Sequence, residues 1–199
     1  DGRGFQTGGC RPSGWRWRSR RPRASIPTSR RTWLAQFCFP DMIDLVIGVD
    51  VGGTTVKAAL LDSDGREHGR SERPTLRYVG PDSIVATIID AVVELQRHLP
   101  EAGRLRAVGL VVPGVVDAQH GIAVYATNLG WRDLPIRQLV AEAVGLPVIL
   151  DHDVRAAGLA ELELGAGRGA HEMLFVALGT GIAAAVITRG QLATGATGM

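Results

Sequence analysis

The run Ile43–Val49 is almost unbroken in its apolar residues. Apolar runs of this length, without polar residues at every second position, are typical of strands buried on both faces, as in parallel sheets covered by helices. The glycine-rich turn Asp50–Thr55 ends the run, and a second apolar run, Val56–Leu61, follows with no helix between them. The sequence therefore predicts a sheet that is buried on both faces and contains a pair of strands adjacent in the chain.

Further strands alternate with helices along the chain from Met42 onward. A short hairpin is predicted at residues 115–127, and the other strands are expected at Arg66–Thr75, Leu105–Val112, Pro147–Leu150, Met173–Leu178 and Ile182–Thr188. This order predicts an α/β fold with a largely parallel sheet and an antiparallel edge.

Three helices are predicted between these strands. Pro81 and Asp82 open the first, whose apolar face is formed by Ile84, Ile88, Val92, Leu95 and Leu99. Asp133 is expected to cap a short second helix that ends before Gly145, with Leu139, Val140 and Ala143 facing inward. Residues 151–153 join a strand to the third helix, Val154–Leu164.

Charge separates residues 1–41 from the rest of the chain. The 199 residues have a formal net charge of +2, but residues 1–41 carry nine Arg and two Asp, and residues 42–199 have a net charge of −5. The acidic body argues against a nucleic-acid-binding surface there. Both cysteines, Cys10 and Cys38, lie outside it, which excludes a disulfide framework or a thiolate metal site in the body.

Residues 1–41 show neither the helical nor the strand period of apolar residues. Four interpretations compete: a basic nucleic-acid arm, a twin-arginine export signal at residues 29–34, a helix-turn-helix, and upstream sequence ahead of a natural start at Met42. Prolines leave no room for two regular helices, and Pro40 and Asp41 interrupt the apolar segment that export needs. We therefore expect a disordered basic leader that is not part of the native fold.

The turn Asp50–Thr55 is the first candidate phosphate-binding site. Its glycines let the backbone approach an anion closely and adopt a positive φ, and its amides and hydroxyls can donate hydrogen bonds to phosphate oxygens. Asp50 can hold Mg²⁺ through water, because Mg²⁺ loses its water reluctantly. A plain glycine hairpin is the alternative, and the P-loop fingerprint is absent. The residues expected to bind phosphate are Gly52, Gly53, Thr54 and Thr55.

The same local plan occurs a second time. Residues 46–55 and 175–184 each contain an apolar strand, a glycine turn with a threonine, and a second strand. In the second copy the turn consists of Gly179, Thr180 and Gly181. Two such hairpins facing each other could clamp the phosphates of a nucleotide, so the repetition indicates two related lobes.

A third turn carries a carboxylate between a strand and a helix. Ligands of open α/β sheets bind at the carboxyl ends of the strands, and a helix N-terminus stabilises an ionised Asp. Asp153 could therefore accept a proton from a substrate hydroxyl, or it could only cap its helix. His152 could be a structural residue or a ligand. Asn128 could be a turn residue or could donate a hydrogen bond to a sugar. Trp131 could pack in the core or line a cleft.

Five segments resemble the ROK family (repressor, open reading frame, kinase), and within it the bacterial ATP-dependent glucokinases. They occur in the order Asp50-Val-Gly-Gly-Thr, Pro113-Gly114, Asn128-Leu-Gly-Trp131, His152-Asp153-Val-Arg-Ala-Ala-Gly-Leu-Ala-Glu161 and Leu178-Gly-Thr-Gly-Ile182. The resemblance covers residues 43–199. It implies the actin-like ATPase (ribonuclease H-like) fold, with residues 42–165 as a first lobe and residues 166–199 as the start of an incomplete second lobe.

The resemblance also implies phosphoryl transfer from ATP to the 6-hydroxyl of glucose. By position, Asp153 would be the general base, Asp50 would hold Mg²⁺ through water, and the two glycine turns would bind phosphate. The sugar would lie near Gly114, Asn128, His152 and Asp153. The intact protein is expected to be a cytoplasmic homo-oligomer that binds glucose or a related hexose and ATP, without nucleic acid or membrane.

Two departures from the family pattern limit this transfer. The family usually has Asn where this chain has His152, which leaves the identity of the sugar open. The family's Gly-Glu-x-Gly-His segment, its zinc site of one His and three Cys, and its adenosine pocket would follow Met199. We therefore expect no zinc site within this chain and no activity from the chain alone. The alternatives are a sugar-responsive ROK-type transcriptional regulator and a non-catalytic sugar-binding protein.

Overall fold

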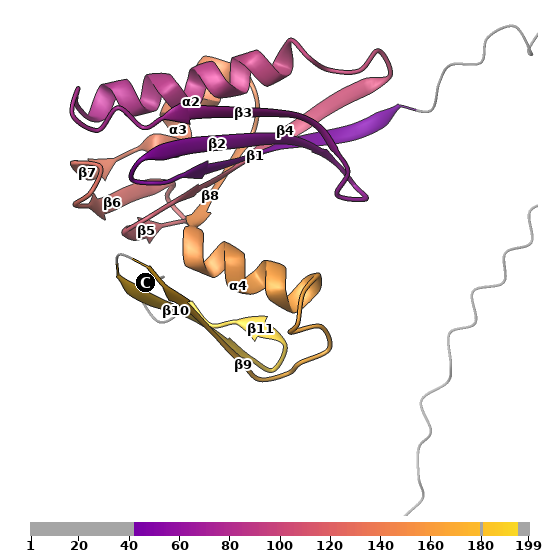
Figure 1. Cartoon of the computed structure of the whole chain (residues 1–199), viewed down its shortest axis with the longest axis vertical. Helices are drawn as coiled ribbons and strands as arrows, with labels where there is room; N and C mark the ends of the chain where they lie inside the picture. The colour runs from indigo at the N-terminus through magenta and orange to yellow at the C-terminus, as the bar shows by residue number, and fades with distance from the viewer. Residues whose placement is uncertain (1–41, 180, 195–199) are drawn as a thin grey trace, which may run out of the picture. The chain divides into compact units, whose positions relative to one another are not determined.

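The computed structural model describes residues 42–179 and 181–194, so the expectations for residues 1–41 and for Thr180 concern residues outside these ranges. Its main sheet has five strands in the order β3-β2-β1-β4-β8 (Figure 1). The strands are β1 (Ile43–Val51), β2 (Thr55–Asp62), β3 (Glu67–Pro74), β4 (Gly103–Val112) and β8 (Val148–His152). Neighbours are antiparallel from β3 to β1 and parallel from β1 to β8, which confirms the α/β class with an antiparallel edge.

Two helices cover one face of this sheet (Figure 1). They are α2 (Pro81–Gln96) and α3 (Ile136–Val144). The predicted apolar face of α2 is confirmed for Ile84, Ile88, Val92 and Leu95, which are buried, but Leu99 lies beyond the end of the helix at Gln96 and is partly buried against the core. These side chains pack on the buried face of β1, β2 and β4 and form one core with them.

The predicted details of α3 are wrong in part. Asp133 does not cap the helix: it lies in β7 with a φ of 48°, and the residue before the helix is Pro135, with no side-chain cap. Val140 is buried as expected, but Leu139 and Ala143 are exposed. The helix begins three residues after Asp133, which changes the side that faces the core. Gly145 ends it in the left-handed region, at a φ of 69°.

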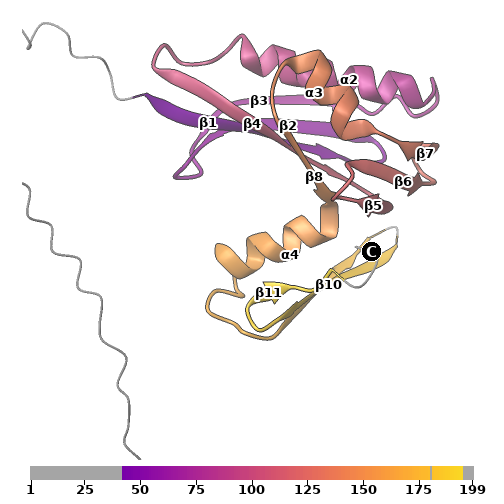
Figure 2. The same ribbon diagram turned by 180° about the vertical axis from the view of Figure 1, so that it is seen from behind.

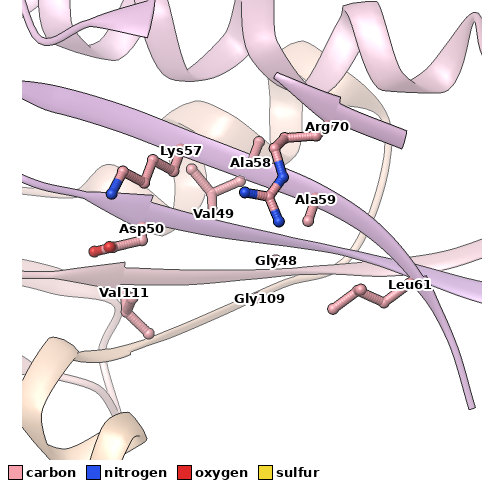
Figure 3. A pocket seen from close by; sticks show the side chains of 10 residues that line it. All are labelled: Gly48, Val49, Asp50, Lys57, Ala58, Ala59, Leu61, Arg70, Gly109 and Val111. Atoms are coloured by element: carbon pink, nitrogen blue, oxygen red, sulfur yellow. The ribbon is translucent and has the colours of Figure 1, made fainter. Parts of the chain in front are cut away.

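The other face of the sheet is open, contrary to the expectation that the first strand is buried on both faces. Leu45, Ile47 and Val49 of β1 are buried, whereas Val46 is 42% exposed. Gly48 of β1 pairs with Gly109 of β4, and a Cβ built on either glycine would meet nothing within 4 Å. No helix among the described residues fills the space over these two glycines. A pocket of about 450 Å³ lies there instead (Figure 3).

A second, small sheet follows β4 at its carboxyl end. It consists of β5 (Val115–Asp117), β6 (Ile122–Ala126) and β7 (Trp131–Leu134), which confirms the predicted hairpin at residues 115–127. Both views place it beside the carboxyl ends of β4 and β8 (Figures 1 and 2). Trp131 is 2% exposed and belongs to the core, which decides between its two predicted places.

The helix α4 (Asp153–Glu163) leads from β8 to a third sheet. That sheet contains β9 (Met173–Leu178), β10 (Ile182–Thr188) and β11 (Gln191–Leu192), in the order β11-β10-β9. A Cβ on Gly158 of α4 would lie 2.6 Å from the Cβ of Ala185, so glycine lets α4 pack closely on β10. Among the described residues, no helix is long and apolar enough to cross a membrane.

Candidate active site

The first glycine turn is closed by its own backbone. The N–H of Gly52 donates to the carbonyl oxygen of Thr55 at 2.9 Å, and a Cβ on Gly52 would also lie 2.9 Å from that oxygen. Neither Gly52 nor Gly53 has a positive φ, so this part of the prediction is wrong. Glycine is needed at position 52 for close approach within the turn.

Thr75 supports this turn from the end of β3. Its side-chain hydroxyl donates to the carbonyl oxygen of Gly52 at 2.6 Å, and its N–H donates to the carbonyl oxygen of Thr54 at 2.9 Å. Thr75 itself is buried, with 1% of its surface exposed. The sequence predicted Thr75 only as the end of a strand, because a lone threonine carries no signal of a partner 23 residues away.

Asn128 belongs to the same part of the site. It lies in the turn between β6 and β7 and is exposed. A Cβ on Gly53 would lie 3.4 Å from the side-chain nitrogen of Asn128, so the predicted sugar residue lies against the predicted phosphate turn.

Asp50 ends the open face of β1. Its side chain remains partly open to solvent, yet the surrounding protein atoms raise the pKa of its carboxyl above the ordinary value, and the negative charge of Asp153 raises it further. Lys57, the register partner of Asp50 on β2, acts in the opposite direction. Both side chains project from the open face (Figure 3). Asp50 and Asp153 also line one cavity of about 480 Å³.

His152 and Asp153 form the start of α4. His152 is the residue that caps the helix: the N–H of Val154 donates to its Nδ1 at 3.2 Å and to Oδ1 of Asp153 at 2.7 Å. Asp153 is the first residue of the helix, so it is not the N-cap that one prediction made it. The hydrogen bond from Val154 corresponds to the imidazole tautomer with its proton on Nε2, and Nδ1 also lies 3.2 Å from Oδ1 of Asp153.

A second cavity, of about 320 Å³, joins the third turn to the second glycine turn. Gly114, His152 and Asp153 line it together with Gly179 and Gly181. Gly114 has a φ of 97°, and a Cβ there would overlap the carbonyl oxygen of Tyr125, so only glycine fits. Four residues predicted for sugar or phosphate binding therefore share one cavity with the predicted base.

The structure leaves one predicted relationship undecided. Gly52, Gly53, Thr54, Thr55 and Asn128 form a group of their own and do not line the cavity that contains Gly179 and Gly181. Asp50 and Asp153 connect the two groups. That the two glycine turns clamp one phosphate chain stays a prediction.

Sequence reasoning placed Asp151 in the third turn but missed its ion pair with Arg155, on either side of Asp153. Arg155 is 8% exposed, and its Nη2 lies 2.7 Å from Oδ1 of Asp151. The available signal was an arginine two residues into a helix that is otherwise rich in alanine and leucine.

Comparisons with known proteins give the family of this chain. The sequence profile of the ROK family matches residues 46–199. A glucokinase of Halalkalibacterium halodurans is 39% identical over 154 residues, which are 77% of this chain and 47% of that protein. A xylose repressor of Caldicellulosiruptor bescii is 26% identical over 156 residues, which are 77% of this chain and 39% of the repressor.

Solved structures extend the comparison to the fold. A ROK family glucokinase from Streptomyces griseus, in complex with glucose and AMPPNP, has a TM-score of 0.70 and 34% identity and covers 78% of this chain and 48% of its own. The chain spans about half the length of the glucokinases that it matches. Its fold is that of the actin-like ATPases, as in the ROK sugar kinases. By the match over residues 46–199, the chain belongs to the ROK family.

Proposed function

We propose that the protein containing this chain is a hexose kinase that transfers the γ-phosphoryl group of ATP to the 6-hydroxyl of glucose. The observation that carries the proposal is the position of Asp153, which lines one cavity with Asp50 and another with the second glycine turn. A carboxylate between a candidate cation ligand and a candidate phosphate turn is what phosphoryl transfer to a hydroxyl requires. The solved glucokinase with glucose and AMPPNP supports this choice of substrates.

Asp153 is the proposed general base. It would accept the proton of the attacking sugar hydroxyl, and the backbone at the start of α4 holds it in place through the N–H of Val154. Gly114, Asn128 and His152 would bind the sugar, with His152 donating a hydrogen bond from Nε2.

Asp50 is the proposed ligand of Mg²⁺, held through water. The fit rests on the raised pKa of Asp50: two carboxyl groups whose charges repel each other face one cavity, and a cation there would relieve this repulsion. When bound, Mg²⁺ neutralises charge on the phosphates. The amides and hydroxyls of the two glycine turns, Gly52–Thr55 and Gly179–Gly181, would donate to phosphate oxygens.

A sugar-responsive regulator is the second candidate, favoured by the similarity to a xylose repressor. The test is a coupled phosphorylation assay of the full-length protein with glucose, mannose, fructose and N-acetylated hexosamines, with ATP and Mg²⁺ present. The proposal expects turnover with glucose. Sugar binding without turnover of any hexose would overturn it in favour of the regulator.

We also propose that residues 42–165 and 166–199 belong to two lobes and that the protein is a cytoplasmic homo-oligomer.

A further inference from the structure

Arg155, at 8% exposed, is the one charged residue among the buried residues that the structure describes. It lies in the first turn of α4, two residues after Asp153, and lines a cavity of about 370 Å³ with Gly114 and His152. A buried charge is costly unless it is paired. Its position beside the proposed base therefore needs a reason other than packing.

Asp151 supplies the opposite charge from the end of β8. Its Oδ1 lies 2.7 Å from Nη2 of Arg155 and also accepts a hydrogen bond from the N–H of His152 at 2.7 Å. Asp151 is held in the sheet by its pairing with Val111 of β4. One carboxylate oxygen thus ties the end of the strand, the capping histidine and the first turn of the helix together.

This ion pair differs from the common i,i+4 pair on a helix surface. Such exposed pairs contribute little, because solvent screens them and both side chains lose freedom. Here the side chain of Arg155 is 10% exposed, and the two partners belong to different elements, with His152 and Asp153 between them. The contact fixes both ends of this five-residue span and so restricts the orientation of His152 and Asp153 inside it.

We propose that Asp151 and Arg155 are positioning residues that hold His152 and Asp153 in the geometry needed for proton transfer. The proposal rests on the proposed function for its effect on catalysis, but it also predicts a structural state of His152 that does not depend on activity. Loss of either side chain removes the contact between Asp151 and Arg155 that joins the end of β8 to the first turn of α4. The strand–helix junction then loses a constraint, and small errors in the placement of a base lower the rate of the chemical step.

The test uses Asp151→Asn, Arg155→Lys and Arg155→Met in the full-length protein, with Glu94→Gln as the matched control. Glu94 of α2 forms an ion pair with Arg73 of β3 at 2.9 Å, so this pair also joins a helix to a strand of the main sheet, but it lies away from Asp153. Two readouts are taken from each variant. One is kcat and KM for glucose, and the other is the ¹⁵N signals of the His152 imidazole, which report whether Nδ1 is an acceptor.

We expect Asp151→Asn and Arg155→Met to lower kcat by roughly 10- to 100-fold with a much smaller change in KM. In the unaltered protein the His152 signals should show one tautomer, with Nδ1 unprotonated, and both variants should show a mixture. Arg155→Lys keeps the charge but not the planar guanidinium. Its kcat should therefore lie between that of the unaltered protein and that of Arg155→Met. Glu94→Gln should leave both readouts unchanged.

Unchanged kcat and unchanged His152 signals in Asp151→Asn and Arg155→Lys, with only a lower melting temperature, would overturn the proposal and make the pair purely structural. If Arg155→Met does not fold, Asp151→Asn, which preserves the shape of the side chain, and Arg155→Lys, which preserves its charge, decide the matter alone. If the unaltered protein phosphorylates no sugar, the proposed function fails, but the His152 signals still distinguish a positioned from an unpositioned junction.

Discussion

The carboxyl group of Asp50 at the end of β1 shares a cavity with the carboxyl group of Asp153 at the start of α4. The two residues are far apart in sequence. Asp50 lies at the carboxyl end of β1, and Asp153 directly follows β8, a strand of the same sheet. Burial first, and the negative charge of Asp153 second, raise the pKa of Asp50. The like charges are held together by the fold, which is the arrangement expected where a cation binds.

The first prediction concerns the titration of Asp50. In Asp153→Asn the pKa of Asp50 should fall, because the nearby negative charge is gone, but it should stay above the ordinary value because burial remains. The measurement is the ¹³C chemical shift of the Asp50 carboxyl as a function of pH in both proteins. An identical titration in the two would mean that the carboxyl groups do not interact.

The second prediction concerns stability against pH. The raised pKa means that folded Asp50 holds its proton more tightly than unfolded Asp50, so its contribution is present below the ordinary value of 3.8 and is lost as pH rises through the folded pKa. Asp50→Asn should therefore raise the melting temperature at about pH 7 and give no gain at about pH 3.

Asp62 provides a control of opposite sign for this experiment. The side chain of His68, above all, lowers the pKa of Asp62, so its contribution is present above the ordinary value and is lost as pH falls through the folded pKa. Asp62→Asn should lower the melting temperature at about pH 7. A loss of stability in both variants at that pH would contradict the raised pKa of Asp50.

The third prediction concerns the hydroxyl that supports the first glycine turn. Thr75→Val keeps the shape of the side chain but removes the donor to the carbonyl oxygen of Gly52. We expect a loss of about 1 kcal/mol in the free energy of unfolding, because a part-buried carbonyl loses its hydrogen-bond partner. We also expect a higher KM for ATP with little change in KM for glucose, measured by steady-state kinetics.

Thr87→Val is the matched control. Thr87 is also buried, at 7% exposed, and its hydroxyl donates to the carbonyl oxygen of Ser83 within α2, away from the turn. It should lose stability in the same way and leave KM for ATP unchanged. An equal rise in KM for ATP in both variants would show that Thr75 acts through general stability and not through the turn.

The sequence predicted the elements well where local signals are strong. Pro81, the spacing of Ile84 and Ile88, and the turn at Gly145 are set by neighbours in the chain, so α2 and the end of α3 were found. The start of α3 was wrong because Asp133 resembles a cap residue but is engaged in β7. The prediction that β1 is buried on both faces was wrong. An apolar run shows that a strand can be buried, but it does not show whether a helix among the described residues covers each face of the sheet.

The candidate site was predictable only as far as single turns carry information. The glycines of each turn and the carboxylate of Asp153 stand at strand ends, where ligands of such sheets bind, and the structure places Asp153 in cavities with both Asp50 and Gly179. Thr75 and Arg155 were missed because their partners, Gly52 and Asp151, are specified by register and by the strand–helix junction. The sequence holds no local signal for the contact of Thr75 with Gly52, and the i,i+4 spacing of Asp151 and Arg155 does not show that the pair is largely buried.

The fourth prediction concerns Asp153 itself. Asp153→Asn keeps the size of the side chain and an oxygen that can accept from the N–H of Val154, but the amide cannot take a proton from a sugar hydroxyl. We expect kcat to fall roughly 10²–10⁴-fold, the usual contribution of a general base. Stability should change little, because His152 remains the N-cap and Asn substitutes well for Asp near a helix start.

Glu163→Gln makes the same chemical change on the same helix and serves as the control. Glu163 is exposed near the end of α4, and it lines neither cavity that contains Asp153. It should leave kcat and the melting temperature unchanged, so a large effect at Asp153 could not be attributed to the lost charge on α4. Near-normal turnover of Asp153→Asn would remove the proposed base. Because a sugar-sensing regulator needs no proton acceptor at this position, that result would favour the regulator over the kinase.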